Sequence, residues 1–187
     1  MKIRQLTPEY HAKVSALLRH AFPGSSYEEQ LVDNLHKQGR SLHEWVCIHI
    51  NTVIAYIAFS SAYKGNEVCG LHLAPLAVKP EFQGKGIGSE LLRFALRQEA
   101  IRDNTIFVLG DPGLYRKFGF ETCTQPLCPF ASKNGHFLSI RNTTTIPFTV
   151  GYEPEFALGR ETIKKKTKNA NSGGAAPAQA GRKIRRK

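Results

Sequence analysis

The stretch that decides the fold runs from Leu73 to Ser89 and reads LAPLAVKPEFQGKGIGS. It begins as an apolar strand, continues through a loop with glycine at positions 84, 86 and 88, and leads directly into an amphipathic helix. Glycine lets the backbone approach a ligand, and the start of the helix adds free N–H groups and a partial positive charge. The segment therefore predicts an anion site, such as one for phosphate or pyrophosphate, with Lys85 adding charge at its rim.

Two common phosphate-binding loops do not have this spacing. The dinucleotide fingerprint requires G-x-G-x-x-G, whereas the chain has G-x-G-x-G from Gly84 to Gly88. The ATP and GTP loop requires glycine five positions before its Gly-Lys pair, and that position is Lys79. The spacing therefore excludes both loops.

A second motif, GDPGLYRKFGF, occupies residues 110–120. The pattern Q-x-x-G-x-G at 83–88, after a strand ending in Leu-Ala-Val, resembles motif A of the GNAT N-acetyltransferases, where it grips the pyrophosphate of acetyl-CoA. The pattern Tyr-x-x-x-Gly-Phe at 115–120 resembles motif B of the same family. PLAV before the loop and LGDPxLYxxFGF after it are similar to the YhbS-like branch. The resemblance covers about residues 2–156.

The resemblance implies the acyl-CoA N-acyltransferase fold, which mixes α/β and α+β features. Its twisted, mostly antiparallel sheet is flanked by helices and splays apart between the fourth and fifth strands, where CoA is wedged. Pro75 fits this independently, because proline cannot donate to a strand ladder and is found at bulges or edges. The implied activity is direct transfer of an acetyl group from acetyl-CoA to a primary amine.

The resemblance also implies roles for individual residues. Tyr115 is expected to be the general acid that reprotonates the CoA thiolate, and a backbone N–H near Ala77 or Val78 is expected to stabilise the oxyanion. Asp111 is expected to cap the helix that follows it. The contacts to acetyl-CoA are expected from Leu76, Ala77, Val78, Gln83, Gly84, Lys85, Gly86, Ile87, Gly88, Ser89, Asp111, Pro112, Tyr115 and Phe118.

The general base is not fixed by the sequence. Glu67, just before the strand, and His72 within it are the candidates, and a chain of water molecules is a third. The acceptor pocket is expected at residues 20–27 and 126–136. The acceptor itself stays open among a small amine, an antibiotic, a peptide N-terminus and a protein lysine.

The secondary-structure pattern predicts one α/β domain over residues 1–160. Thr7-Pro8-Glu9 predicts a helix start with an apolar face through Leu17, and Ser26-x-x-Glu29 predicts a capping box that opens a second helix ending at Gly39. A helix is also expected at 88–99 and a short one at 111–118. Strands are expected at 2–6, 44–50, 53–60, 70–78, 105–109, 120–124 and 137–140.

The net charge of +11 over 187 residues is concentrated in a tail. Residues 161–187 contain nine of the 26 Lys and Arg side chains and one of the 15 acids. This tail has no aromatic residue and is too polar to bury a core, so we expect it to be disordered from about Lys164. It is either a solvated terminus or a nonspecific arm for RNA, DNA or another polyanion.

Composition and the absence of long apolar runs limit the class of protein. With 41% hydrophobic and 22% charged residues and no run of about 20 apolar residues, the chain predicts a globular protein without a membrane span. The start lacks the apolar region of a secretory signal, and four cysteines are too few for a disulfide scaffold, so we expect reduced thiols in the cytoplasm. Cys123-x4-Cys128 has no second pair at zinc spacing, so no metal site is expected.

Three hypotheses about function therefore stand together. The first is an acetyl-CoA-dependent N-acetyltransferase, and the second is a CoA-binding sensor without turnover. The third is a domain that its basic tail docks on nucleic acid or the ribosome. Either a monomer or a homodimer is compatible with the sequence.

Overall fold

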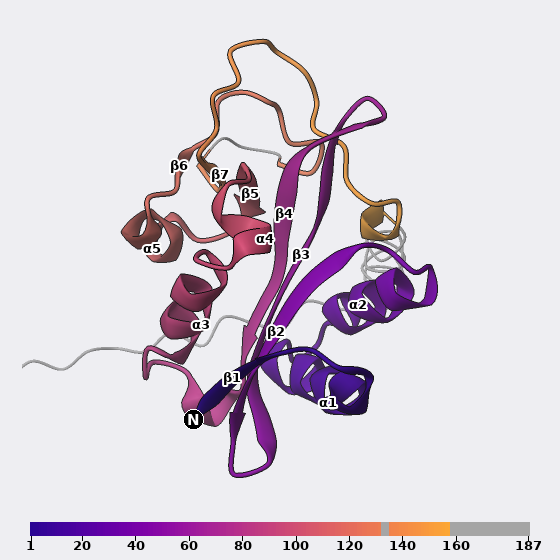
Figure 1. Cartoon of the computed structure of the whole chain (residues 1–187), viewed down its shortest axis with the longest axis vertical. Coiled ribbons are helices and arrows are strands. Elements are labelled where there is room, and N and C mark those ends of the chain that lie inside the picture. The colour runs from indigo at the N-terminus through magenta and orange to yellow at the C-terminus, as the bar shows by residue number, and fades with distance from the viewer. Residues whose placement is uncertain (132–134, 158–187) are drawn as a thin grey trace, which may run out of the picture.

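The computed structural model of the chain describes residues 1–131 and 135–157 and has one sheet of seven strands at its centre (Figure 1). The strand order is β1-β2-β3-β4-β5-β7-β6, and every neighbouring pair is antiparallel except β4 and β5. The mixed, mostly antiparallel sheet agrees with the predicted fold class. The strands are β1 (Lys2–Gln5), β2 (Leu42–His49), β3 (Thr52–Lys64), β4 (Glu67–Val78), β5 (Ile106–Leu109), β6 (Glu121–Thr122) and β7 (Phe137–Ile140).

Helices cover both faces of this sheet. On one face lie α1 (His11–Ala21), which follows the short helix η1 (Pro8–Tyr10), and α2 (Tyr27–Lys37). The opposite face carries the remaining elements: η2 (Pro80–Phe82), α3 (Ile87–Ala95), α4 (Glu99–Arg102), α5 (Pro112–Tyr115) and η3 (Arg116–Phe118). Among the described residues, no helix has both the length and the apolar character needed to cross a membrane.

Each face of the sheet has its own hydrophobic core. Val14, Leu17 and Leu18 of α1 are buried against β2 and β3, as their helical spacing predicts. Leu91, Leu92 and Ala95 of α3 are buried on the opposite face. These two layers hold the middle strands rigidly, and β3 is buried along most of its length.

The sheet splays apart between β4 and β5, as expected. The two strands pair only at Leu71 with Ile106 and at His72 with Phe107. Beyond His72, β4 continues for six residues to Val78 along β3 alone, whereas β5 continues along β7. The edge of β4 from Leu73 to Val78 therefore borders an opening in the sheet.

The prediction of a bulge or an edge at Pro75 is confirmed. Ile57 lies opposite Leu76 and Phe59 lies opposite Leu73, so two β4 residues, Ala74 and Pro75, face the single residue Ala58 of β3. An extra residue bends a strand and increases its twist. The bulge lies at the opening, where β4 leaves the direction of β5.

Three local predictions need correction. Ser26 does not cap α2, because its ψ of 6° already belongs to the turn; the Tyr27 N–H bonds the Ser25 hydroxyl instead, which itself donates to Glu28. The helix expected at 88–99 divides into α3 and α4.

The hairpin strands β3 and β4 are longer than expected, because the chain turns tightly at Gly65, with φ of 60°, and Lys64 pairs with Glu67. The predicted tail 161–187 lies outside the described residues.

Candidate active site

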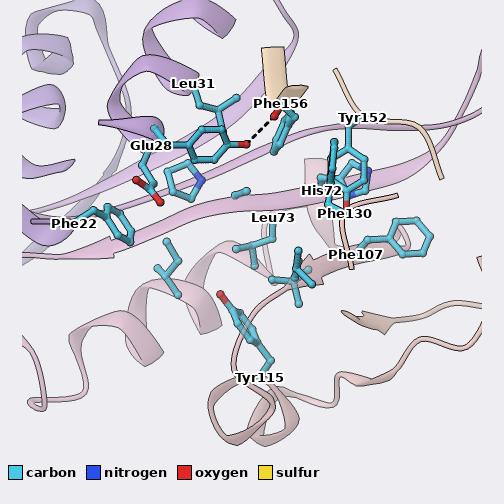
Figure 2. A pocket seen from close by; sticks show the side chains of 16 residues that line it. Phe22, Glu28, Leu31, His72, Leu73, Phe107, Tyr115, Phe130, Tyr152 and Phe156 are labelled. Atoms are coloured by element: carbon cyan, nitrogen blue, oxygen red, sulfur yellow. Dashed lines mark hydrogen bonds between the residues drawn. The ribbon is translucent and has the colours of Figure 1, made fainter. Parts of the chain in front are cut away.

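A cavity of about 330 Å³ occupies the opening between β4 and β5. Figure 2 shows the 16 side chains around it. They come from the residue after α1, from α2, β4, β5 and α5, and from the segments that contain Phe130, Tyr152 and Phe156. They are Phe22, Tyr27, Glu28, Leu31, His72, Leu73, Ala74, Pro75, Leu76, Phe107, Val108, Leu109, Tyr115, Phe130, Tyr152 and Phe156. We call this space the central cavity.

The central cavity reaches both faces of the sheet. Leu73, Val108 and Tyr115 belong to the core on the α3 face. Leu31 and Phe156 belong to a cluster on the α2 face, against which Tyr27, Phe130 and Tyr152 also pack. A group that enters from the α3 face can therefore meet a group that enters from the α2 face without crossing a layer of side chains.

The glycine loop, residues 83–89, borders a second cleft of about 370 Å³ on the α3 face. Gly84 and Gly86 have φ of 72° and 79°, a conformation that turns backbone N–H groups outward and that other residues rarely adopt. A Cβ at Gly88 would lie 3.1 Å from Cγ2 of Val78, so the loop and the strand approach closely only because position 88 is glycine. The free N–H groups at the start of α3 face this cleft and fit an anion.

The predicted cofactor residues divide into three groups. Val78, Gln83, Gly84, Gly86, Ile87, Gly88 and Ser89 line the cleft, while Leu76 and Tyr115 line the central cavity. Leu114 lines the cleft and its neighbour Tyr115 lines the cavity, so α5 borders both spaces.

The remaining predicted cofactor residues line neither space. Lys85 is exposed, with Nζ 5.4 Å from the centre of the Phe82 ring. The Asp111 carboxylate caps α5 by accepting from the Gly113 N–H at 3.0 Å, as predicted. The others in this group are Ala77, Pro112 and Phe118.

The end of β4 offers backbone donors to the opening. The Lys79 N–H donates to Ile54 of β3 at 2.8 Å, and consecutive peptide groups of a strand point to opposite edges. The N–H of Ala77 therefore faces β3, whereas the N–H groups of Val78 and Leu76 face the opening. The Val78 carbonyl accepts from Nε2 of Gln83 at 2.9 Å, which ties the loop to this edge.

Tyr115 forms part of the cavity wall on the α3 side. Its side chain is only 7% exposed, and Figure 2 shows its hydroxyl directed into the cavity. Burial, with a smaller contribution from the negative charge of Asp111, raises the pKa of Tyr115 to about 12. The phenol is therefore fully protonated at neutral pH and can act as a proton donor.

His72 lies on the other wall, where it is buried. Its Nε2 is 3.1 Å from the carbonyl oxygen of Gly151, so Nε2 carries the proton and donates it. Its ring stacks on Tyr152 at 3.5 Å between centroids, and burial lowers the pKa of His72 to about 4. At neutral pH the imidazole is uncharged and fixed in place.

Glu67 is not brought to this site. It is exposed at the hairpin turn, where it pairs with Lys64 at the far end of β4, and it lines neither the central cavity nor the cleft. Of the predicted catalytic residues, the structure brings together only Tyr115 and His72.

The predicted acceptor segments contribute part of the α2-side wall. Phe22 and Tyr27 come from the first segment and Phe130 from the second, whose residues 132–134 lie outside the described residues. Sequence reasoning missed Glu28, Tyr152 and Phe156. The Ser25-x-x-Glu28 spacing and the aromatic pair four residues apart are the signals that point to them.

The cysteines and acidic residues do not form a metal centre in the described part of the chain. No group of three or more His, Cys, Asp or Glu side chains there has an arrangement that can hold a metal ion. All four cysteines are free thiols, and burial raises the pKa of Cys47, Cys69 and Cys123.

Comparison with known proteins identifies relatives of this arrangement. A family model described as acetyltransferase (GNAT) domain matches residues 40–122. The chain is 33% identical over 126 residues to "Uncharacterized N-acetyltransferase YhbS" of Escherichia coli K12, across 65% of this chain and 74% of that protein. It is 35% identical over 106 residues to "Uncharacterized N-acetyltransferase YjhQ" of the same strain, across 54% and 59% of the two chains.

Two solved structures have the same fold and carry ligands. The crystal structure of YhbS from Escherichia coli in complex with CoA has a TM-score of 0.76 and 28% identity, and the alignment covers 83% of this chain and 91% of that one. A GNAT-family acetyltransferase from Brucella melitensis in complex with acetyl-CoA has a TM-score of 0.69 and 28% identity, covering 83% and 97%.

Proposed function

Because this chain belongs to the GNAT N-acetyltransferase family, we propose that it transfers an acetyl group from acetyl-CoA directly to a primary amine. The observation that carries the proposal is that α5 and the end of β4 border both the cleft and the central cavity. The cleft at the glycine loop suits the pyrophosphate, and the central cavity leads from it through the sheet. The relatives crystallised with CoA and acetyl-CoA support the same cosubstrate.

The glycine loop supplies the binding energy for the cosubstrate. N–H groups of residues 84–89 and the start of α3 bind the pyrophosphate oxygens, and Lys85 adds a positive charge at the rim. Gln83 fixes the loop to Val78, which holds the loop beside the end of β4. The thioester then extends along β4 toward Tyr115.

Two groups of the chain act on the thioester. The backbone N–H of Val78 or Leu76 donates to the carbonyl oxygen of the thioester. It stabilises the negative charge that develops on this oxygen when the amine attacks. Tyr115 gives its phenolic proton to the sulfur as the carbon–sulfur bond breaks. Since the pKa of Tyr115 is raised to about 12, the phenol retains this proton until the thiolate leaves.

The amine must lose a proton before or during attack. His72 is buried in the cavity wall with its pKa lowered to about 4, so it is a weak base, and its Nε2 is already bound to Gly151. We assign His72 a positioning role, since it holds Tyr152 in place by stacking. Glu67 is too far along β4 to serve as the base, which leaves a chain of water molecules or another side chain of the cavity wall to take the proton.

Replacing Tyr115 by phenylalanine tests the proposal. The variant keeps the ring in the cavity wall but lacks the acidic proton, so we expect turnover of acetyl-CoA to fall by roughly 100-fold while its Kd stays within twofold. A CoA sensor without turnover predicts no acetyl transfer by either protein. Acetyl transfer that is equal in both proteins would remove Tyr115 from the mechanism.

We also propose that catalysis needs only residues 1–160. The described residues that line the cleft and the central cavity all lie between Phe22 and Phe156. Deletion of 161–187 is expected to leave kcat/KM for acetyl-CoA within twofold. Loss of RNA retention at low salt in the same variant would assign polyanion binding to the tail, and retention that survives the deletion would contradict it.

A further inference from the structure

The α2 side of the central cavity carries the acidic side chain of Glu28. Among the described residues that line the cavity, Glu28 is the one Asp or Glu, and none of them is Lys or Arg. Glu28 lies in the first turn of α2 and is half-buried. The Ser25 hydroxyl donates to its Oε2 at 2.7 Å, which fixes the carboxylate at the wall. A cation that enters this cavity therefore meets the Glu28 carboxylate at the wall.

The rest of this side is an aromatic wall, formed by Phe130, Tyr152 and Phe156. Tyr152 is its centre, with ring centroids 4.8 Å from Phe130 at 65° and 5.1 Å from Phe156 at 59°. The His72 ring, which also lines the cavity, stacks on Tyr152 with 3.5 Å between the ring centroids. Aromatic rings pack favourably in such inclined arrangements, and all three of these side chains line the cavity.

The aromatic wall is tied to α2, which carries Glu28. The Tyr27 hydroxyl donates to the carbonyl oxygen of Phe156 at 3.0 Å, and Figure 2 shows this bond beside Glu28. Tyr27 and Glu28 are neighbours, so the carboxylate and the aromatic wall are held in one rigid unit. The site is therefore built to recognise a positive charge and an apolar ring in the same molecule.

We infer that the acceptor is a small aromatic monoamine, whose nitrogen binds Glu28 and whose ring lies against Phe130, Tyr152 and Phe156. This inference rests on the proposed acetyl transfer. Acceptors with several positive charges, such as polyamines and aminoglycosides, would need several carboxylates, and the described cavity wall supplies one. The cavity of about 330 Å³ must also admit the thioester end of the cosubstrate, and the space that is left favours a small molecule over a folded protein surface.

The same placement completes the reaction. Glu28 takes one proton from the ammonium, and the freed nitrogen lone pair forms the bond to the thioester carbon. The carbon–sulfur bond breaks and its electron pair stays on sulfur, which takes the phenolic proton of Tyr115. The nitrogen still carries a second surplus proton after the carbon–nitrogen bond forms, and it loses this proton to solvent. The products are the N-acetyl amine, CoA and this released proton, and the proton on Glu28 returns to Tyr115 through solvent.

Binding of 2-phenylethylamine to the full chain saturated with CoA tests the inference by calorimetry. We compare the natural chain with Glu28→Gln and with the control Glu29→Gln, whose carboxylate pairs with Arg19 and does not line the cavity. Loss of the charged partner is expected to weaken binding by roughly 10- to 100-fold in Glu28→Gln and by less than twofold in the control. Spermidine and kanamycin are expected to bind at least tenfold more weakly than 2-phenylethylamine.

The ring contact has its own test. Phe156→Leu keeps an apolar side chain but removes a ring. The affinity for 2-phenylethylamine is therefore expected to fall several-fold, whereas the affinity for n-butylamine is expected to stay unchanged. Equal binding to the natural chain and Glu28→Gln overturns the inference, as does binding of spermidine in preference to the aromatic amine. If CoA binds and 2-phenylethylamine does not, the inference fails alone. If CoA does not bind, the proposed function fails with it.

Discussion

The ring of Tyr115 packs on the backbone of Gly110 so closely that a Cβ at position 110 would lie 2.5 Å from Cε2 of the tyrosine. Gly110 is itself fixed, because its N–H donates to the His136 carbonyl at 2.8 Å and its own carbonyl lies 3.2 Å from Nδ1 of His136. The loop after β5 therefore places the proposed proton donor through a contact that no residue other than glycine permits.

Replacing Gly110 by alanine is expected to displace the Tyr115 ring. A displacement of about 1 Å at a reacting group can cost on the order of 100-fold in rate, so we expect kcat to fall by 10- to 100-fold. The Kd for acetyl-CoA is expected to change by less than twofold, because the glycine loop is untouched. Gly135→Ala is the control, since a Cβ there meets no atom within 4 Å. Equal losses in both variants would contradict the positioning role.

The raised pKa of Tyr115 predicts the alkaline limb of the rate profile. An ordinary tyrosine, with a pKa of about 10, would lose its proton and slow the reaction near that pH. Since burial raises the pKa to about 12, the phenol stays protonated up to about pH 10 and the rate is expected to show no fall from this group below it. A fall in kcat centred near pH 9 that is present in the natural chain and absent in Tyr115→Phe would contradict this.

The lowered pKa of His72 predicts acid sensitivity of the fold. A buried neutral histidine binds fewer protons than the unfolded chain between pH 6.5 and about 4, so stability is complete above pH 6.5 and is lost as the pH falls through this window. The full effect is about 3 kcal/mol. Urea unfolding of the natural chain and of His72→Gln from pH 7 to pH 4 measures this effect. The free energy of unfolding of the variant is expected to fall less steeply with falling pH. Parallel curves would contradict it.

Arg40 anchors the segment that carries the aromatic wall. Its guanidinium binds the buried Glu155 carboxylate at 2.9 Å and lies 3.3 Å from Glu153, close to Tyr152 and Phe156 in sequence. Arg40→Ala removes the guanidinium that faces two buried carboxylates, so we expect a lower Tm and a several-fold higher KM for the acceptor with an unchanged Kd for acetyl-CoA. Lys37→Ala, which breaks an exposed ion pair with Asp33, is expected to change neither the Tm nor the KM for the acceptor.

The sequence predicted the frame of the site because strong local signals lie there. The glycine loop, Pro75 and the Asp111 cap each depend on a property of one residue type: freedom at positive φ, the missing N–H of proline, and a short carboxylate before a helix. β7 was predicted at 137–140, which are its observed bounds.

The contents of the site were predicted less well, because they depend on contacts between distant segments. Glu67 and His72 lie on the same strand, and only the hairpin register shows that Glu67 lies at the end away from the opening. Glu28 belongs to a capping interaction one residue earlier than the predicted one, and its position in the cavity depends on how α2 packs on β4. Nothing in the local pattern around Tyr152 and Phe156 shows which cavity they reach.

The most direct test of the account is calorimetric titration of acetyl-CoA into the natural chain, Gly86→Asn and Gly86→Asp. Both substitutions tolerate the positive φ of 79° at this position and place a side chain of the same shape in open space at the cleft, so they differ only in charge. We predict micromolar binding to the natural chain, a modest loss in the asparagine variant, and a further loss of at least tenfold in the aspartate variant from repulsion of the pyrophosphate. Equal affinities in the two variants, or no binding to the natural chain, would contradict the assignment of the glycine loop as the cosubstrate site.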